Sequence, residues 1–530
     1  MFLFSVANNQ VNDIIIHYRL QFKVVKTTLK TKKMNFAKFK CRTLVDEHNN
    51  KIMGNKTSLT RNFAWTAVDR FSNLLIQFVL GIIIARLVTP AEYGILGILM
   101  VFINISQVFI DSGLSSALIY NNNLSSKNLS TVFVFNFSVS TIIYLLLFIG
   151  APLIESFFNL HKLSLYLRVS ACVLIINSLI DVPTSVLKIK LDFRSLALSN
   201  LTSTLAGGFI GVYLAYHNYG IWALIAQLLS RNILLMCLLF VQSKWKPNIL
   251  FDIPAFKTLF KYGINIFSAS CLTKIIEEGT SFFIAKILNP FSLGIYSRSL
   301  QFAALPTSSV GGIITSALFP SLSSIKNDEE RFENIFHKVI EYQAAICVPL
   351  FMWIAMVAEP IVRLLLTDRW IAVVPILQIL CIGRILVPTA YITEQVINAK
   401  GRSDLFFRQQ LIKMLLKFML IMIFIHLGLM AVAIAEATYT VLQFFITNHF
   451  AKGLTPFLSK NQLKHMMPYI ISALISSIAG YILLPLFANL YLQIILPLLA
   501  SALLYLVFVS MIYRKSVFNE LMSKVVNRKV

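Results

Sequence analysis

Three ionisable residues lie close together in an otherwise apolar stretch near the middle of the chain. Lys274 and Glu278 are four positions apart, so on a helix they share one face and can form an ion pair, while Glu277 lies one position away. One lysine cannot neutralise two glutamates, and a carboxylate removed from water can hold a proton or Na⁺ instead. The spacing predicts an ion-coupling site, and a purely structural ion pair is the alternative.

Four basic residues in apolar surroundings suit an anionic ligand. Arg298 and Arg384 have no acidic neighbour in the sequence, and the planar guanidinium can donate two parallel hydrogen bonds to a diphosphate. Arg86 and Lys286 lie at the ends of apolar stretches. We predict that these four side chains line a cavity and bind a diphosphate. The alternative is that they extend toward the membrane interface as anchors.

Further ionisable residues occur in apolar stretches, where an isolated charge costs several kcal/mol and usually has a partner or faces a cavity. Asp111 precedes Ser112-Gly113 and is expected to cap a turn. Asp69 and Arg70 lie at the start of the first span and are expected to be interfacial anchors, with a functional role as the alternative. The others have no role assigned from spacing alone: Asp181, Arg231, Glu394, Lys413, Lys417 and Glu436.

Motifs for catalysis or cofactor binding do not occur in the sequence. It contains no GxxxxGK[ST] loop for ATP, no HExxH, no GxSxG and no histidine or cysteine pattern with metal-ligand spacing. We therefore predict a protein that is not an enzyme and needs no cofactor or metal. The six cysteines form no CxxC pair and are read as free thiols.

Composition excludes a soluble domain. Of 530 residues, 57% are hydrophobic and only 13% are charged, with a mean hydropathy of +0.74, whereas soluble domains are about one quarter charged. The formal charge of +24 would suggest a nucleic-acid partner in a soluble protein. Here we expect no nucleic-acid partner, because lysine and arginine are typical of cytoplasmic loops of membrane proteins.

Apolar stretches separated by short polar joints predict about fourteen transmembrane helices in an all-α polytopic membrane protein. They are expected near residues 63–85, 93–119, 130–154, 165–187, 196–216, 221–241, 256–287, 293–319, 339–366, 374–397, 406–426, 429–450, 466–486 and 490–513.

The distribution of basic residues predicts the orientation of these helices. Joints after even-numbered spans are rich in lysine and arginine, as in Lys188, Lys190 and Arg194, whereas the joints around Asn218 and Gly428 contain none. Because basic loops stay in the cytoplasm, both termini are predicted to be cytoplasmic.

An internal repeat appears when the sequence is shifted by 200 residues. The segment 84–95 (IARLVTPAEYGI) aligns with 284–295 (IAKILNPFSLGI), and 84–118 matches 284–318 at nine of 35 ungapped positions. Six spans separate the copies, so both have the same orientation. Parallel repeats of this kind are typical of transporters built from two halves.

The repeat predicts two parallel six-helix lobes around a central cavity, plus two extra C-terminal helices. We expect an N-lobe at 53–245, a C-lobe at 246–455, and the last two spans with a basic cytoplasmic tail at 456–530. Residues 1–52 form a basic extension that is expected to be disordered and dispensable, with Met53 as an alternative start.

The segment 61–119 resembles the start of bacterial Wzx-type lipopolysaccharide/O-antigen flippases, in the multidrug/oligosaccharidyl-lipid/polysaccharide (MOP) exporter superfamily. The residues that carry the resemblance are Ala85-Arg86-Leu87, Pro90, Tyr93-Gly94, Asp111-Ser112-Gly113 and the segment 183–195 (PTSVLKIKLDFRS). The resemblance extends over residues 55 to about 515 and includes the fourteen-span layout.

The resemblance implies export of an undecaprenyl-diphosphate-linked oligosaccharide across the bacterial inner membrane by alternating access of two lobes. A proton or Na⁺ gradient, or the membrane potential, would drive it. A monomer in the lipid bilayer, working beside polysaccharide polymerase or export machinery, is expected. Two alternatives stay open: a multidrug or small-cation exporter of the same superfamily, and a membrane glycosyltransferase or polymerase, against which the short periplasmic joints argue.

Overall fold

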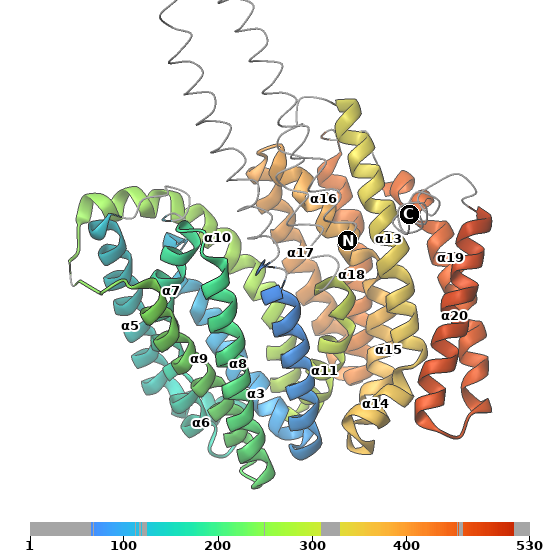
Figure 1. Cartoon of the computed structure of the whole chain (residues 1–530), viewed down its shortest axis with the longest axis horizontal. Coiled ribbons are helices and arrows are strands. Elements are labelled where there is room, and N and C mark those ends of the chain that lie inside the picture. Colours follow the sequence, from blue (N-terminus) through green and yellow to red (C-terminus); the bar gives the residue numbers. More distant parts are fainter. Residues whose placement is uncertain are drawn as a thin grey trace, which may run out of the picture.

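A computed structural model shows a predominantly helical protein arranged as two groups of helices side by side (Figure 1). The structure describes residues 65–66, 68–111, 113–115, 118, 125–248, 250–308, 329–452, 454 and 459–512. The predicted extension 1–52 and the end of the basic tail lie outside these residues. The expected all-α membrane architecture is confirmed, because twelve described helices are long and apolar enough to cross a bilayer.

The first group of helices corresponds to the predicted N-lobe. It contains the first helix, Val68–Leu87, followed by α3 (Pro90–Asp111), α5 (Ser126–Phe158), α6 (Leu163–Ser170), α7 (Cys172–Ile189), α8 (Phe193–Tyr216) and α9 (Ile221–Ser243). Asp192 caps the start of α8 by accepting a hydrogen bond from the Ser195 backbone N–H at 3.1 Å.

The second group contains the helices of the predicted C-lobe. They are α10 (Ile253–Phe283), the π-helical turn η2 (Ile284–Leu288), α11 (Pro290–Ala303), α13 (Glu329–Met356), α14 (Ala358–Leu366), α15 (Val373–Gly383), α16 (Val387–Ala399), α17 (Ser403–Phe424) and α18 (Leu429–Ala451). The first residues of α10 lie on the first group, where Phe256 packs against Phe135 of α5, and the helix then crosses to the second group (Figure 1). The remaining helices, α19 (Ser459–Leu483) and α20 (Leu490–Ile512), stand outside this group and pack on α13 and α14 (Figure 1).

Two of the fourteen expected spans are not among the twelve. The stretch 256–287 forms α10 and η2, which together contain six charged residues, and the stretch 293–319 is described only as far as residue 308. The count of fourteen therefore stays a prediction. The tenth span is broken into α15 and α16 by a 3₁₀ turn at Arg384–Leu386, since Pro388 has no N–H with which to continue the helix.

The two copies of the internal repeat pack against each other where α3 of the N-lobe meets α11 of the C-lobe. A Cβ atom on Gly94 would lie 1.7 Å from the Pro290 carbonyl oxygen, and one on Gly294 would lie 1.8 Å from that of Pro90. Only glycine permits this approach of two backbones. The Pro-x-x-x-Gly spacing found twice in the sequence thus builds a pseudo-symmetric contact between the lobes.

Candidate functional site

The contact between the lobes includes both basic residues of the repeat. Arg86 Nε donates to the Leu365 carbonyl at 2.9 Å, and its Nη2 donates to Leu364. Lys286 Nζ donates to the Phe157 carbonyl and lies 4.1 Å from the centre of that ring. These carbonyls belong to the last turns of α14 and α5, where helices leave carbonyl groups without intrahelical partners and carry partial negative charge.

Arg86 and Lys286 are thus equivalent in position and in contact: each extends from its own lobe to a helix C-terminus of the other. We call these two residues, with Pro90, Gly94, Pro290 and Gly294, the outer contact. By the charge pattern of the loops it lies at the predicted periplasmic end. Trp370 adds to it by donating a 2.9 Å hydrogen bond to the Ala85 carbonyl.

Arg298 also lies between the lobes and is only 7% exposed. Its guanidinium stacks 3.9 Å from the centre of the Tyr93 ring and donates to Gln301 Oε1 at 2.6 Å and to the Gly81 carbonyl at 3.4 Å. In this conformation Arg298 therefore holds the first helix and α3 against α11. A diphosphate could be bound only after these contacts separate.

An open pocket of about 490 Å³ is lined by polar side chains of the N-lobe. Asp69 on the first helix accepts from Asn73 at 2.6 Å and from Asn200 on α8 at 3.2 Å. Arg231 on α9 also lines the pocket, interacts electrostatically with Asp69, and has a buried Nε with no hydrogen-bond partner among the described residues. The remaining lining residues are Thr66, Arg70, Leu74 and Gln77.

Small residues on α8 place Arg231 at this pocket. A Cβ on Gly207 would lie 2.9 Å from Arg231 Cα, and one on Gly211 would lie 2.8 Å from Gln227 Cβ. The GxxxG spacing lets α8 and α9 approach closely, as in many pairs of membrane helices. Across the pocket, Arg70 extends toward the C-lobe and donates a 3.4 Å hydrogen bond to the Ser308 carbonyl.

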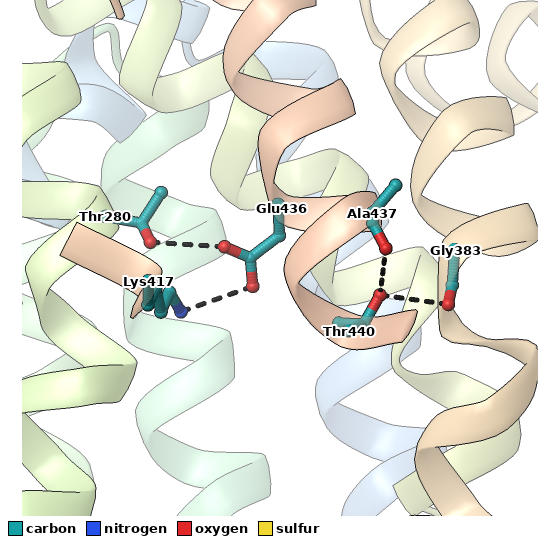
Figure 2. A network of polar contacts seen from close by, with 6 residues as sticks. All are labelled: Thr280, Gly383, Lys417, Glu436, Ala437 and Thr440. Carbon is teal, nitrogen blue, oxygen red and sulfur yellow. Dashed lines mark hydrogen bonds and ion pairs between the residues drawn. The ribbon is translucent and has the colours of Figure 1, made fainter. Parts of the chain in front are cut away.

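The C-lobe contains two buried ion pairs on adjacent helices. Lys413 pairs with Glu394, and Lys417 Nζ lies 3.2 Å from Glu436 Oε1. The other oxygen of Glu436 accepts from the Thr280 hydroxyl at 3.3 Å, so α10, α17 and α18 meet at this carboxylate (Figure 2). All four charged side chains belong to residues less than 9% exposed.

Arg384 lies in the 3₁₀ turn between α15 and α16, and its buried Nε has no partner among the described residues. Its charge interacts with Tyr296 and Tyr391 inside the C-lobe. The four predicted diphosphate ligands are consequently not gathered in one place. Three lie at the boundary between the lobes, in or beside the outer contact, and Arg384 lies within the C-lobe.

The predicted coupling residues on α10 do form one cluster. Lys274 Nζ is 2.9 Å from Glu277 and 3.5 Å from Glu278. Glu278 also accepts a 2.8 Å hydrogen bond from Asn104 on α3, which links the two lobes. The side chain of Glu277 is 54% exposed and that of Glu278 is 14% exposed, so the two carboxylates have different surroundings despite being neighbours.

With this geometry established, comparison with known proteins identifies the family. The family model described as "Polysaccharide biosynthesis protein" matches residues 83–375, which is more than half of the chain. The chain belongs to this family.

Individual relatives and solved structures agree with the assignment. The chain is 26% identical over 373 residues to a Klebsiella pneumoniae "uncharacterized membrane protein in cps region", covering 69% of this chain and 76% of the relative. It is 23% identical over 330 residues to the Rhizobium meliloti succinoglycan biosynthesis transport protein ExoT, covering 62% of this chain and 67% of that protein.

Among solved structures, the lipid II flippase MurJ in an inward closed conformation matches with a TM-score of 0.72 at 18% identity, over 85% of this chain and 99% of MurJ. A multidrug resistance MATE transporter of the MOP superfamily in an inward-facing conformation matches with a TM-score of 0.58 at 15% identity, over 73% and 98% of the two chains. These likenesses establish the fold. The predicted resemblance to polysaccharide-exporting membrane proteins is confirmed by the family match and these relatives.

The N-lobe pocket was not predicted as a site, although its charged residues were recognised as lying in apolar stretches. Asp69, Asn200 and Arg231 are separated by up to 162 positions in the sequence and come from three helices. The available signal was the GxxxG spacing at Gly207 and Gly211. It predicts that this helix packs closely against another helix, but it does not predict which one.

Proposed function

We propose that this protein transports a lipid-linked oligosaccharide with a diphosphate group from the cytoplasmic to the periplasmic leaflet of the bacterial inner membrane. The observation that carries the proposal is the polar N-lobe pocket, where Arg70 and Arg231 outnumber the single carboxylate of Asp69. A basic pocket within the membrane suits an anionic headgroup whose lipid tail stays in the bilayer. The names of ExoT and MurJ, a transport protein and a lipid II flippase, point in the same direction.

The outer contact supports alternating access as the mechanism. Closure at the predicted periplasmic end leaves the pocket to be reached from the cytoplasmic side, where the substrate would be assembled. Transport would then require Arg86, Lys286 and Arg298 to leave their partners across the lobe boundary. Once released, these three cations could bind the diphosphate as it moves outward. Their predicted role as diphosphate ligands would then belong to the open conformation.

In this proposal the cluster of Lys274, Glu277 and Glu278 takes part in coupling to protons or Na⁺. Its support is the excess of one carboxylate and the bond from Glu278 to Asn104, since a change in charge there would act directly on a contact between lobes. Cytoplasmic termini, a monomeric state and cooperation with polysaccharide polymerase or export machinery belong to the same proposal.

The test is transport by the purified chain in proteoliposomes that contain an undecaprenyl-diphosphate-linked oligosaccharide. Substrate reaching the opposite leaflet is measured by its oxidation with membrane-impermeant periodate. We expect transport by the wild type and at least tenfold slower transport by Arg231→Ala. Arg168→Ala is the matched control, because Arg168 does not line the pocket and its guanidinium lies 4.5 Å from the centre of the Phe148 ring. Equal rates for all three proteins would refute the role of the pocket.

A multidrug or small-cation exporter is the second proposal compatible with the fold, and the MATE likeness favours it. The same proteoliposomes distinguish the two, because an exporter of organic cations should move a fluorescent cation such as ethidium. Two arginines against one aspartate in the pocket argue against cation binding. A glycosyltransferase or polymerase reaction would instead consume the lipid-linked substrate, which chromatography of the recovered lipid would detect.

A further inference from the structure

Two aspartates that the pocket does not use lie on neighbouring helices of the N-lobe. Asp111 is at the end of α3, Asp181 is in α7, and their charges act on each other. Asp111 accepts from Gln107 at 2.8 Å, and Gln107 in turn accepts from Asn177 on α7 at 2.9 Å. These bonds fix the carboxylate of Asp111 beside α7, in addition to any role in the turn predicted from Ser112-Gly113.

Asn136 on α5 completes this arrangement. Its Nδ2 donates to Asp181 Oδ2 at 3.2 Å, whereas its Oδ1 has no hydrogen-bond donor among the described residues. The residue is 0% exposed. A bond of 3.0 Å between the hydroxyls of Ser140 and Ser178 holds α5 against α7 one turn away. A fully buried amide oxygen without a donor, beside a carboxylate, is a position that a cation would satisfy.

The surrounding charges leave this group of acids under-compensated. Lys188 on α7 interacts with both aspartates, but its own side chain is exposed. Among the described cations of the adjoining helices, Arg231 on α9 interacts with Asp69, Lys274 on α10 pairs with Glu277 and Glu278, and Lys127 on α5 lies 4.0 Å from Asp252. Lys190, directly after α7, donates to the Ser243 carbonyl, and Lys257 on α10 is exposed. Among the residues that the structure describes, the cation that acts on both carboxylates is thus one solvent-exposed lysine.

Exposure is graded across the three oxygen-bearing residues. Asp111 is exposed, Asp181 is intermediate and Asn136 is fully buried. A small cation could therefore enter at Asp111 and be held deeper, between Asp181 and Asn136. Oxygen ligands of this kind suit a hard cation, and a pair of neighbouring carboxylates can alternatively share a proton.

We propose that Asp111, Asp181 and Asn136 form a second cation site, in which a proton or Na⁺ binds inside the N-lobe separately from the α10 cluster. The inference deepens the proposed function, on which its role in transport rests, because binding here would couple α3, α5 and α7 to the ion gradient. Ion binding itself needs no substrate and can be measured alone.

The experiment measures ion binding to the full-length chain in lipid nanodiscs without substrate. Binding of ²²Na⁺ is determined at alkaline pH, and proton release on addition of NaCl is followed with a pH-sensitive dye in weak buffer. The variants are Asp181→Asn, Asp111→Asn and Asn136→Leu. Glu155→Gln is the matched control, because Glu155 lies at the other end of α5 and accepts from the backbone of Ser164.

We expect wild type and Glu155→Gln to bind Na⁺ with release of protons, and the Asp181 and Asp111 variants to lose at least tenfold in apparent affinity. If the site takes protons alone, Na⁺ will not bind, and a pH titration will show one proton fewer taken up by Asp181→Asn than by the control. Asn136→Leu should weaken Na⁺ binding while leaving uptake of a shared proton. It also provides a test should an aspartate variant fail to fold.

Unchanged Na⁺ binding and unchanged proton uptake in the folded variants would overturn the site. Failure of the proposed function is a separate result: the ion would bind at Asp181 as predicted, but lipid-linked oligosaccharide would not change leaflet in proteoliposomes. Conversely, transport without any effect of these variants on ion binding would leave the flippase proposal intact and eliminate the second site.

Discussion

The two lobes differ in how the charged side chains of their helices are paired. In the C-lobe, Lys413 and Lys417 are paired with glutamates, and both lysines are at most 5% exposed. In the N-lobe, Arg231 and Asp69 line an open pocket, and the arginine keeps a donor without a hydrogen-bond acceptor. The buried lysines and glutamates of the C-lobe are therefore neutralised, although Arg384 keeps a buried Nε without a hydrogen-bond partner among the described residues. The charges of the N-lobe pocket stay available.

This difference indicates a division of labour. A buried ion pair adds little net stability compared with an apolar pair, but the loss of one partner leaves a costly charge in the interior. The C-lobe pairs consequently fix how α10, α16, α17 and α18 pack. The N-lobe charges are free to bind a ligand because the protein does not neutralise them completely.

Removal of the Glu436 carboxylate should have the largest effect on stability. This carboxylate neutralises the buried Lys417 and accepts a hydrogen bond from the Thr280 hydroxyl. We expect Glu436→Gln to lower the free energy of unfolding by about 3–5 kcal/mol, measured by denaturant unfolding in detergent micelles. The double variant Lys417→Met/Glu436→Leu should recover most of this loss. A single variant as stable as the wild type would mean that the pair is not buried in the membrane-embedded protein.

Arg231 should show the reverse behaviour, with a large functional effect and a small effect on stability. Loss of a charged hydrogen bond costs about 1.5–3 kcal/mol, so Arg231→Ala should weaken binding of a diphosphate-linked lipid by about tenfold to a hundredfold. Titration with the lipid, monitored by tryptophan fluorescence, measures this change. Arg231→Lys should recover binding only in part, since an ammonium lacks the planar fork. A collapse in stability would instead assign Arg231 a structural role.

The sequence was sufficient to predict the helical membrane fold and the repeat, because both depend on local patterns: twenty-residue apolar stretches, and Pro90 and Gly94 recurring as Pro290 and Gly294. Apart from the pair of Lys274 and Glu278, which are four positions apart, the partners of individual charges could not be predicted. Glu436 pairs with a lysine 19 positions away, but Arg231 faces an aspartate on a helix 162 positions earlier. Which helices meet is determined by tertiary packing, and so is whether a charge is neutralised.

The carboxylates of the α10 cluster lie at the boundary between the lobes. Their variants show whether a carboxylate there serves function, as proposed for the N-lobe pocket, or structure, as in the C-lobe ion pairs. Glu278 is shielded and bonded to Asn104, while Glu277 is more than half exposed. We expect Glu278→Gln to reduce ion-driven transport several-fold and Glu277→Gln to have a smaller effect, because exposed ion pairs contribute about 0–1 kcal/mol. Transport under an imposed ion gradient measures both. Equal effects would show that the shared Lys274 matters more than the contact between lobes.

The smallest effects are expected at the outer contact, where the repeats meet most symmetrically. Arg86 and Lys286 are both solvent-exposed and each bonds a helix C-terminus of the opposite lobe. A cation at such a terminus contributes about 0.3–1 kcal/mol, so either alanine variant should shift the equilibrium toward opening by about two- to fivefold.

Distances between spin labels at the exposed residues Asn218 and Arg369, one in each lobe, report this opening. The labels would be introduced into a chain whose six cysteines have been replaced. Because each contact spans the same boundary at a different point, the effects of Arg86→Ala and Lys286→Ala should add in the double variant. If only one variant increases the population of the longer distance, Arg86 and Lys286 are equivalent in position but not in their contribution to closure. The two lobes would then differ in energetics at the outer contact, just as they differ in the pairing of their interior charges.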